Sequence, residues 1–135
     1  MAEKAEAQPA TGYLLSDDLM FNSRITGTAR DLGLVVKAAR STEVLEELAR
    51  RQPPSCVLVD LANPGLEITG LIGRLRELCA RMPRVVAYGS HVDTATLRAA
   101  REAGCDVVLP RSKFVEELPR ALPGWLGGQG SAAEE

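Results

Sequence analysis

Short apolar runs alternate with longer amphipathic segments along most of the chain. The runs are three to five residues long and rich in Val, Leu and Ala, which is typical of strands buried on both faces. Between the runs, apolar residues recur at intervals of three and four, which predicts helices that pack by one side. The expected strands are Gly12–Ser16, Leu34–Ala38, Val57–Asp60, Val85–Tyr88 and Val107–Leu109.

Local signals for helix starts and stops indicate where the helices should lie. Ser41 and Asp93 suit helix N-termini as capping residues, whereas Gly33 and Gly104 suit helix ends. Pro119 falls inside the last helix, where we expect a local irregularity. The expected helices cover about Met20–Leu32, the stretch after Ser41, the stretch between Asp93 and Gly104, and Phe114 to about Trp125. A further helix, after the Asn63-Pro64-Gly65 turn, is expected to carry Ile68, Leu71, Ile72, Leu75 and Leu78.

Five consecutive strand–helix units predict an α/β fold with one parallel five-stranded sheet and helices on both of its faces. The expected architecture is flavodoxin-like and doubly wound, (βα)5, with strand order 2-1-3-4-5. No linker interrupts the alternation, so we expect one domain over residues 12–126. Residues 1–11 and 127–135 have the composition of a flexible leader and of a disordered tail.

Composition excludes several classes of function. The chain has 135 residues and a formal net charge of −2, which gives no electrostatic reason for direct nucleic-acid binding. No apolar run approaches the roughly 20 residues that span a bilayer, and the N-terminus lacks the apolar block of a secretory signal. We therefore expect a cytoplasmic protein without a membrane span. The three cysteines have no zinc-binding spacing and are expected as buried thiols: Cys56, Cys79 and Cys105.

Carboxylates stand where two of the expected strands end. Asp17 and Asp18 follow the first strand, and Asp60 closes the third. If these strands are parallel neighbours, the three side chains meet at the C-terminal edge of the sheet, where ligands bind in open α/β sheets. Three crowded carboxylates repel one another and call for a cation, so the cluster is a metal site or a site that has lost its metal. The competing interpretation is that Asp17 and Asp18 only cap the following helix.

These motifs together resemble a bacterial response-regulator receiver domain. The resemblance covers roughly residues 12–126 and includes Asp17-Asp18, Asp60, Pro64-Gly65 and Ala103-Gly104-Cys105-Asp106, each at the interval usual in that family. It implies a stand-alone signalling module of a two-component phosphorelay rather than an enzyme. The expected partners are a histidine kinase or a phosphotransfer protein. A downstream protein would then bind the face made by the fourth helix, the fifth strand and the fifth helix.

The resemblance also implies a set of site residues. Asp60 would be the phosphoacceptor, and Asp17 and Asp18 would hold Mg²⁺, with Asp60 and the backbone carbonyl of Ala62 completing the protein ligands. Such a donor set suits Mg²⁺, which prefers carboxylate oxygens, water and phosphoryl oxygens. The ion would neutralise charge on the phosphoryl group as the carboxylate attacks.

The chain departs from the family pattern at three positions. Gly89 stands in place of the hydroxyl residue at the end of the fourth strand, with Ser90 beside it as the nearest substitute. Arg111 takes the place of the lysine after the fifth strand, and Lys113 is the next cation along the chain. Val108 fills the position of the aromatic switch residue. The expected phosphoryl contacts are therefore Arg111, Ser90 and Lys113, and the usual route for transmitting phosphorylation is absent.

Three functions follow from these observations. The first is an atypical receiver that accepts a phosphoryl group on Asp60. The second is a pseudo-receiver that docks or dimerises without phosphorylation, and Gly89 and Val108 favour it. The third is a flavodoxin-like cofactor binder, which is disfavoured because carboxylates, not a glycine-rich loop, follow the first strand. His91 is expected as an exposed loop residue, and Ser112 as a candidate N-cap of the last helix.

Overall fold

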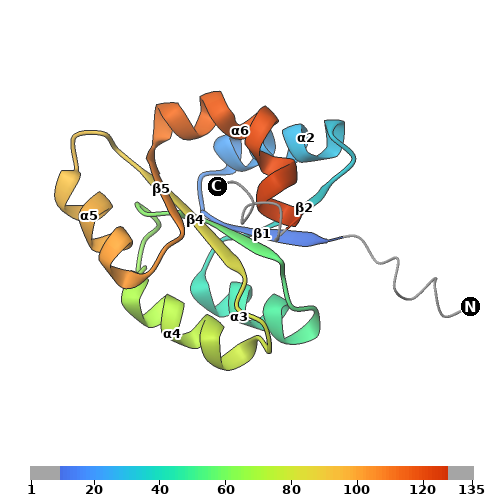
Figure 1. Ribbon diagram of the computed structural model, residues 1–135, viewed down its shortest axis with the longest axis horizontal. Helices are drawn as coiled ribbons and strands as arrows, with labels where there is room; N and C mark the ends of the chain where they lie inside the picture. The colour runs from blue at the N-terminus through green and yellow to red at the C-terminus, as the bar shows by residue number, and fades with distance from the viewer. Residues whose placement is uncertain (1–9, 128–135) are drawn as a thin grey trace, which may run out of the picture.

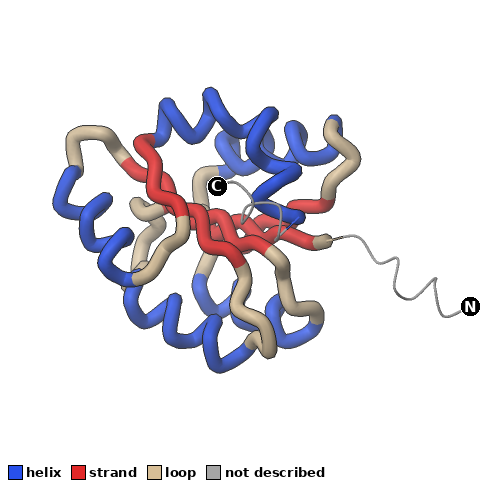
Figure 2. The backbone as a smooth tube through the Cα atoms, in the orientation of Figure 1, coloured by secondary structure: helices blue, strands red, loops and turns tan. Residues whose placement is uncertain are grey.

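The computed structural model describes residues 10–127. One sheet of five parallel strands crosses the molecule in the order β2-β1-β3-β4-β5, with helices on both sides (Figures 1 and 2). The fold class and strand order expected from the sequence are confirmed. The strands are β1 Thr11–Leu15, β2 Val35–Ala39, β3 Cys56–Asp60, β4 Arg84–Gly89 and β5 Val107–Pro110. The helices are α2 Leu19–Asp31, α3 Thr42–Arg51, α4 Ile68–Leu78, α5 Thr94–Ala103 and α6 Arg111–Gly127.

Strand alternation divides the core into two layers. Leu14, Leu58 and Tyr88 face a cluster that α2 and α6 cover, whereas the neighbouring strand residues face a cluster under α3, α4 and α5. Figure 1 shows α2 and α6 together on one side of the sheet and the other three helices on the opposite side. Because both faces are covered, the inner strands β1, β3 and β4 are almost wholly apolar, whereas the outer strand β2 has the exposed Lys37.

Side-chain caps begin four of the helices. Asp18, Ser41, Glu67 and Asp93 each accept a hydrogen bond from the backbone N–H three residues later. The cap was expected at Ser41, and a helix start was expected at Asp93. Gly104 ends α5 with a φ of 109°, in the left-handed region that favours glycine. These boundaries bring the residues between each strand and the next helix to the C-terminal edge of the sheet.

The last helix differs from the prediction. It begins at Arg111, directly after β5, so Ser112 lies inside the helix and is not its N-cap. Pro119 and Pro123 are both accommodated within it. At the other end of the domain, Thr11 belongs to β1 and not to a leader. Gly127, predicted as the start of the tail, is the last residue of α6. Residues 1–9 of the predicted leader and residues 128–135 of the predicted tail lie outside the described residues.

Burial of the cysteines agrees with the prediction for two of the three. Cys56 and Cys79 are buried thiols, and Cys105 is half-buried. Within residues 10–127, no helix is both long and apolar enough to cross a membrane.

Candidate functional site

Asp60 lies at the end of β3 with only 6% of its surface exposed. Ser16 donates a hydrogen bond from its Oγ to Asp60 Oδ2 over 2.7 Å. The backbone N–H of Ala62 donates to the other oxygen, Oδ1, over 2.9 Å. Both carboxylate oxygens therefore have protein donors, which is how a buried carboxylate is stabilised.

Strand register explains why Ser16 occupies this position. Leu15, the last residue of β1, pairs with Val59 in the parallel ladder of β1 and β3, so the residue that follows, Ser16, lies beside Asp60. Successive side chains point to opposite sides of an extended strand. Ser16 is therefore turned inward and fully buried, and Asp17 is exposed. The sequence analysis missed Ser16, although counting the register from the two apolar runs would have found it.

Asp18 caps α2 and pairs with Arg111. Its Oδ1 accepts a hydrogen bond from the backbone N–H of Phe21 over 3.1 Å, and its Oδ2 lies 3.1 Å from Nη2 of Arg111. The Phe21 N–H is the main cause of a lowered Asp18 pKa, and the guanidinium adds to it. Asp18 therefore caps α2 and also forms an ion pair.

Arg111 provides a positive charge at the C-terminal edge of the sheet. Its guanidinium carbon lies 4.3 Å from the centre of the Phe21 ring, so the side chain is held by a π face and a carboxylate together. Lys113 points elsewhere, toward Glu116 and Glu117 on the same helix, at 3.9 and 3.8 Å.

A pocket of about 340 Å³ opens between the ends of β3 and β4 and the start of α6. Of the predicted phosphoryl contacts, Ser90 and Arg111 line it, together with Asp60, whereas Lys113 does not. Gly89 forms part of the wall, and a Cβ there would meet the side chains of Leu61 and Leu97 at 3.4 Å. The remaining lining residues are Ala62, Tyr88, His91 and Ser112.

Stacked aromatic rings run from this pocket to the end of α6. Tyr88 stacks on Phe114 with ring centres 4.4 Å apart, and Phe114 stacks on Trp125 at 5.8 Å. Burial, and then the charge of Asp60, raise the pKa of the Tyr88 hydroxyl far above its ordinary value. No group within residues 10–127 is in hydrogen-bonding geometry to that hydroxyl.

Val108, in the position predicted for the switch residue, is half-buried against the core under α3, α4 and α5. It provides no ring that could rotate at the pocket.

The predicted metal ligands are Asp17, Asp18, Asp60 and the backbone carbonyl of Ala62. In the part of the chain that the structure describes, no three His, Cys, Asp or Glu side chains are grouped so as to hold a metal ion. Asp60 is the one carboxylate lining the pocket, and both its oxygens accept hydrogen bonds. Asp18 is paired with Arg111. Mg²⁺ is bound by carboxylates, water and phosphoryl oxygens, and here the carboxylates of Asp60 and Asp18 already have hydrogen-bonding partners. Whether Mg²⁺ binds here, with Asp17 or the Ala62 carbonyl contributing, stays a prediction.

Solved structures share this fold at low sequence identity. A response regulator from Thermotoga maritima superposes with a TM-score of 0.74 at 18% identity, covering 89% of this chain and 99% of its own. The receiver domain of NtrX from Brucella abortus gives 0.73 at 16%, with coverages of 86% and 98%. A chain in the co-crystal structure of the Saccharomyces cerevisiae histidine phosphotransfer protein Ypd1 with the receiver domain of Ssk1 gives 0.77 at 14%, with coverages of 94% and 95%.

No protein-family model matches the chain, and curated protein sequences give no match. The structural likenesses nevertheless show that the chain has the fold of a response-regulator receiver domain, as the sequence motifs predicted.

Proposed function

We propose that this chain is a receiver-fold signalling module that acts through protein contacts and does not use Asp60 as a phosphoacceptor. The hydrogen bond of 2.7 Å between Ser16 Oγ and Asp60 Oδ2 is the observation that carries this proposal. A neutral hydroxyl lies where the site would need a second carboxylate to gather a divalent ion.

The chemistry of phosphoryl transfer supports the same conclusion. A carboxylate that attacks a phosphoryl group meets another anion, and a bound metal ordinarily neutralises the charge of that group. Asp60 would have to give up at least one of its two hydrogen bonds before attacking. Arg111 is the nearest cation of the pocket, and its guanidinium is already paired with Asp18.

The face for a downstream protein is the one formed by α5, β5 and α6. β5 is the outermost strand of the sheet on this side, and its four residues are all half-buried. An outer strand with partly exposed apolar residues offers both contact area and unpaired backbone groups to a partner. A second copy of the chain is an alternative occupant of this face.

We place the module in the cytoplasm, with no direct nucleic-acid partner.

The phosphoaccepting receiver is the second candidate. Asp60 lines a pocket that also contains Arg111 and Ser90, which supports it. One related structure is a co-crystal of a receiver domain with a histidine phosphotransfer protein. A histidine kinase or phosphotransfer protein would then be the partner, and Mg²⁺ the cofactor.

Phosphotransfer decides between the two candidates. The full chain is incubated with a small acyl phosphate and Mg²⁺, and phosphorylation is measured by intact-protein mass, with D60N as the control. We expect no labelling above that of D60N. Labelling of the wild type that requires Mg²⁺ and disappears in D60N would contradict the proposal and establish the phosphoaccepting receiver.

A further inference from the structure

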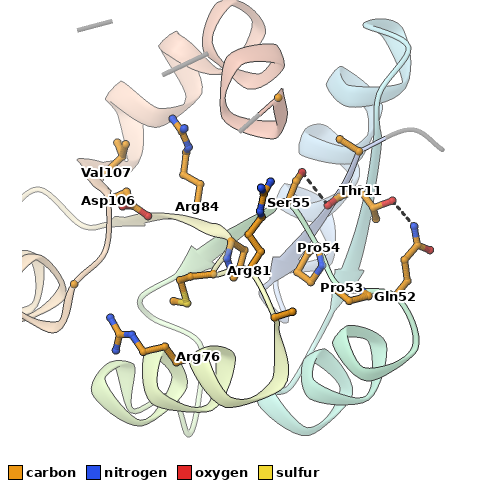
Figure 3. Close-up of a pocket in the computed structure, with 16 residues that line it drawn as sticks. Thr11, Gln52, Pro53, Pro54, Ser55, Arg76, Arg81, Arg84, Asp106 and Val107 are labelled. Carbon is orange, nitrogen blue, oxygen red and sulfur yellow. Dashed lines mark hydrogen bonds between the residues drawn. The ribbon is translucent and has the colours of Figure 1, made fainter. Parts of the chain in front are cut away.

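A second and larger pocket lies at the opposite edge of the sheet, where the strands begin (Figure 3). Its volume is about 1050 Å³, and it is formed by the loops that lead into β3, β4 and β5. Ala10 and Gly127, the two ends of the described part of the chain, also line it. Asp60 is at the other end of β3, so this pocket is separate from the site discussed above.

Arginine side chains give this pocket its charge. Arg76, Arg81 and Arg84 line it, against one acidic residue, Asp106. Asp106 is already engaged, because its Oδ2 accepts a hydrogen bond from the backbone N–H of Val85 over 2.8 Å. Arg76 and Arg81 are exposed and form no ion pair with any residue between 10 and 127. In Figure 3, Arg81 and Arg84 extend to the same side of the pocket, and Arg76 lies apart on α4.

The polar side chains that line this pocket already form hydrogen bonds within the protein. Gln52 donates from Nε2 to Oγ1 of Thr11 over 2.9 Å, and Ser55 donates from Oγ to the carbonyl of Leu126 over 2.7 Å. The second bond fixes the end of α6 beside the pocket. A ligand would therefore meet the guanidinium groups of Arg76 and Arg81 as donors, and guanidinium groups recognise carboxylates by paired hydrogen bonds.

The chain itself supplies a complementary segment. Residues 128–135 follow directly from Gly127 and contain Glu134 and Glu135 but no Lys or Arg. The seven residues from 128 to 134 reach up to about 23 Å when extended, and Gly127, from which they continue, itself lines the pocket. A short connection of this kind holds the carboxylates at an effective concentration on the order of millimolar. A free acidic peptide would have to compete with these tethered carboxylates for the arginines.

We propose that residues 128–135 occupy this pocket, with the carboxylates of Glu134 and Glu135 paired to Arg81 and Arg76. The ligand class is a carboxylate-bearing peptide, and its source is the same chain. The pairs are exposed, so their contribution depends on salt. The proposal does not depend on Asp60 or on the function proposed above.

Nuclear magnetic resonance of the uniformly ¹⁵N-labelled full chain tests this. We expect the Nε–H signals of Arg76 and Arg81 to shift in the double variant E134Q/E135Q. The control is E116Q/E117Q, which removes two charges from the other end of α6 and should leave these signals in place. Raising the salt from about 0.01 M to about 1 M, which shortens the screening length from about 30 Å to about 3 Å, should move the wild-type signals toward those of E134Q/E135Q.

Two results would overturn the proposal. Arginine signals that are the same in the wild type and in E134Q/E135Q would show that the segment does not reach them. Arginine Nε–H signals that shift with protein concentration in the wild type, but not in E134Q/E135Q, would show that the glutamates bind the pocket of a second copy. In that case the occupant comes from another molecule and not from the same chain.

Discussion

A single position decides what the carboxylate at the end of β3 can do. Ser16 gives Asp60 a hydrogen bond that a carboxylate could give only when protonated. Aspartate at position 16 would put two negative charges side by side in a buried place, and such a pair raises the affinity for a divalent cation. On the proposed function, Ser16 is the residue that makes this a hydrogen-bonded site and not a metal site.

Ser16→Asp should create a magnesium site. Without metal, we expect the variant to lose about 1–3 kcal/mol of unfolding free energy, because a buried hydrogen bond is replaced by charge repulsion. At a Mg²⁺ concentration about tenfold above the dissociation constant, the ion should restore about 1.4 kcal/mol. Denaturant unfolding with EDTA or with MgCl₂ measures both quantities.

Ser16→Ala is the matched control, since it loses the same hydrogen bond without gaining a charge. Its stability should not respond to Mg²⁺, and neither should that of the wild type. A wild type stabilised by millimolar Mg²⁺ to the same degree as S16D would contradict this account of the site.

Asp18 should make stability depend on acid pH. Its pKa is lowered in the folded protein, chiefly by the Phe21 N–H and also by Arg111. The folded state therefore favours the ionised form. This stabilisation is present above the ordinary pKa of 3.8 and is lost as the pH falls through the lower folded value. Asp18→Asn keeps a capping side chain but removes the charge.

Urea unfolding of the wild type and D18N between pH 2 and 7 checks this. The wild type should be the more stable near neutral pH, and the difference should shrink toward the acid end. A difference that is constant over the whole range would show that the charge of Asp18 has no role.

At the scale of the elements, helix boundaries follow local chemistry except in α6. Local signals placed the caps of α3 and α5 correctly because a cap needs only one side chain and a backbone N–H three residues away. They failed at Ser112, which looks like a cap in the sequence. Arg111 is bound to Asp18 and to the Phe21 ring of α2, and the helix begins there, immediately after β5. These contacts join residues 90 or more positions apart, so no local signal reports them.

The glycine at the end of α5 offers a test of element boundaries. Gly104→Ala should lower the unfolding free energy by about 1–2 kcal/mol, because a side chain is disfavoured at its φ of 109°. Gly73→Ala is the matched control, inside α4 with no atom within 4 Å of the added Cβ. It should raise stability by about 0.5–1 kcal/mol. Thermal and urea unfolding measure both changes. Equal effects of the two substitutions would contradict the assignment of Gly104 as a left-handed cap.

At the scale of the whole molecule, two apolar layers enclose the sheet and bury most of the thiol surface. Burial raises the pKa of Cys56 to about 12 and, with the charge of Asp106 adding to it, that of Cys105 to about 11. In the unfolded chain both thiols titrate near 9.0. Above pH 9 the unfolded state therefore loses protons that the folded state keeps.

Stability should consequently fall in alkali. The thiols' contribution is fully present below pH 9 and is lost as the pH rises toward their folded values. The buried Cys56 lowers the unfolding free energy by up to about 1.4 kcal/mol per pH unit in that interval, and the half-buried Cys105 lowers it by less, because solvent screens its charge. Reversible unfolding with a reductant at pH 8 to 11 measures the slope. Cys105→Ser, at the half-buried position, should make the slope shallower. An unchanged slope in this variant would contradict the contribution of the Cys105 thiol to the loss of stability in alkali.

The sequence by itself determined the order of elements, the parallel sheet and the edge at which Asp60 lies. These features follow from periodicity and from the short connections between strands and helices, which are local along the chain. Only the tertiary structure decided which neighbour Asp60 has. A shift of one residue in the pairing of β1 with β3 would exchange the inward and the outward side chain. The register that the fold adopts places Ser16 next to Asp60 and leaves Asp17 exposed. Contacts between α2 and α6 then assigned Asp18 to Arg111, because packing brings together charges that are far apart in the chain.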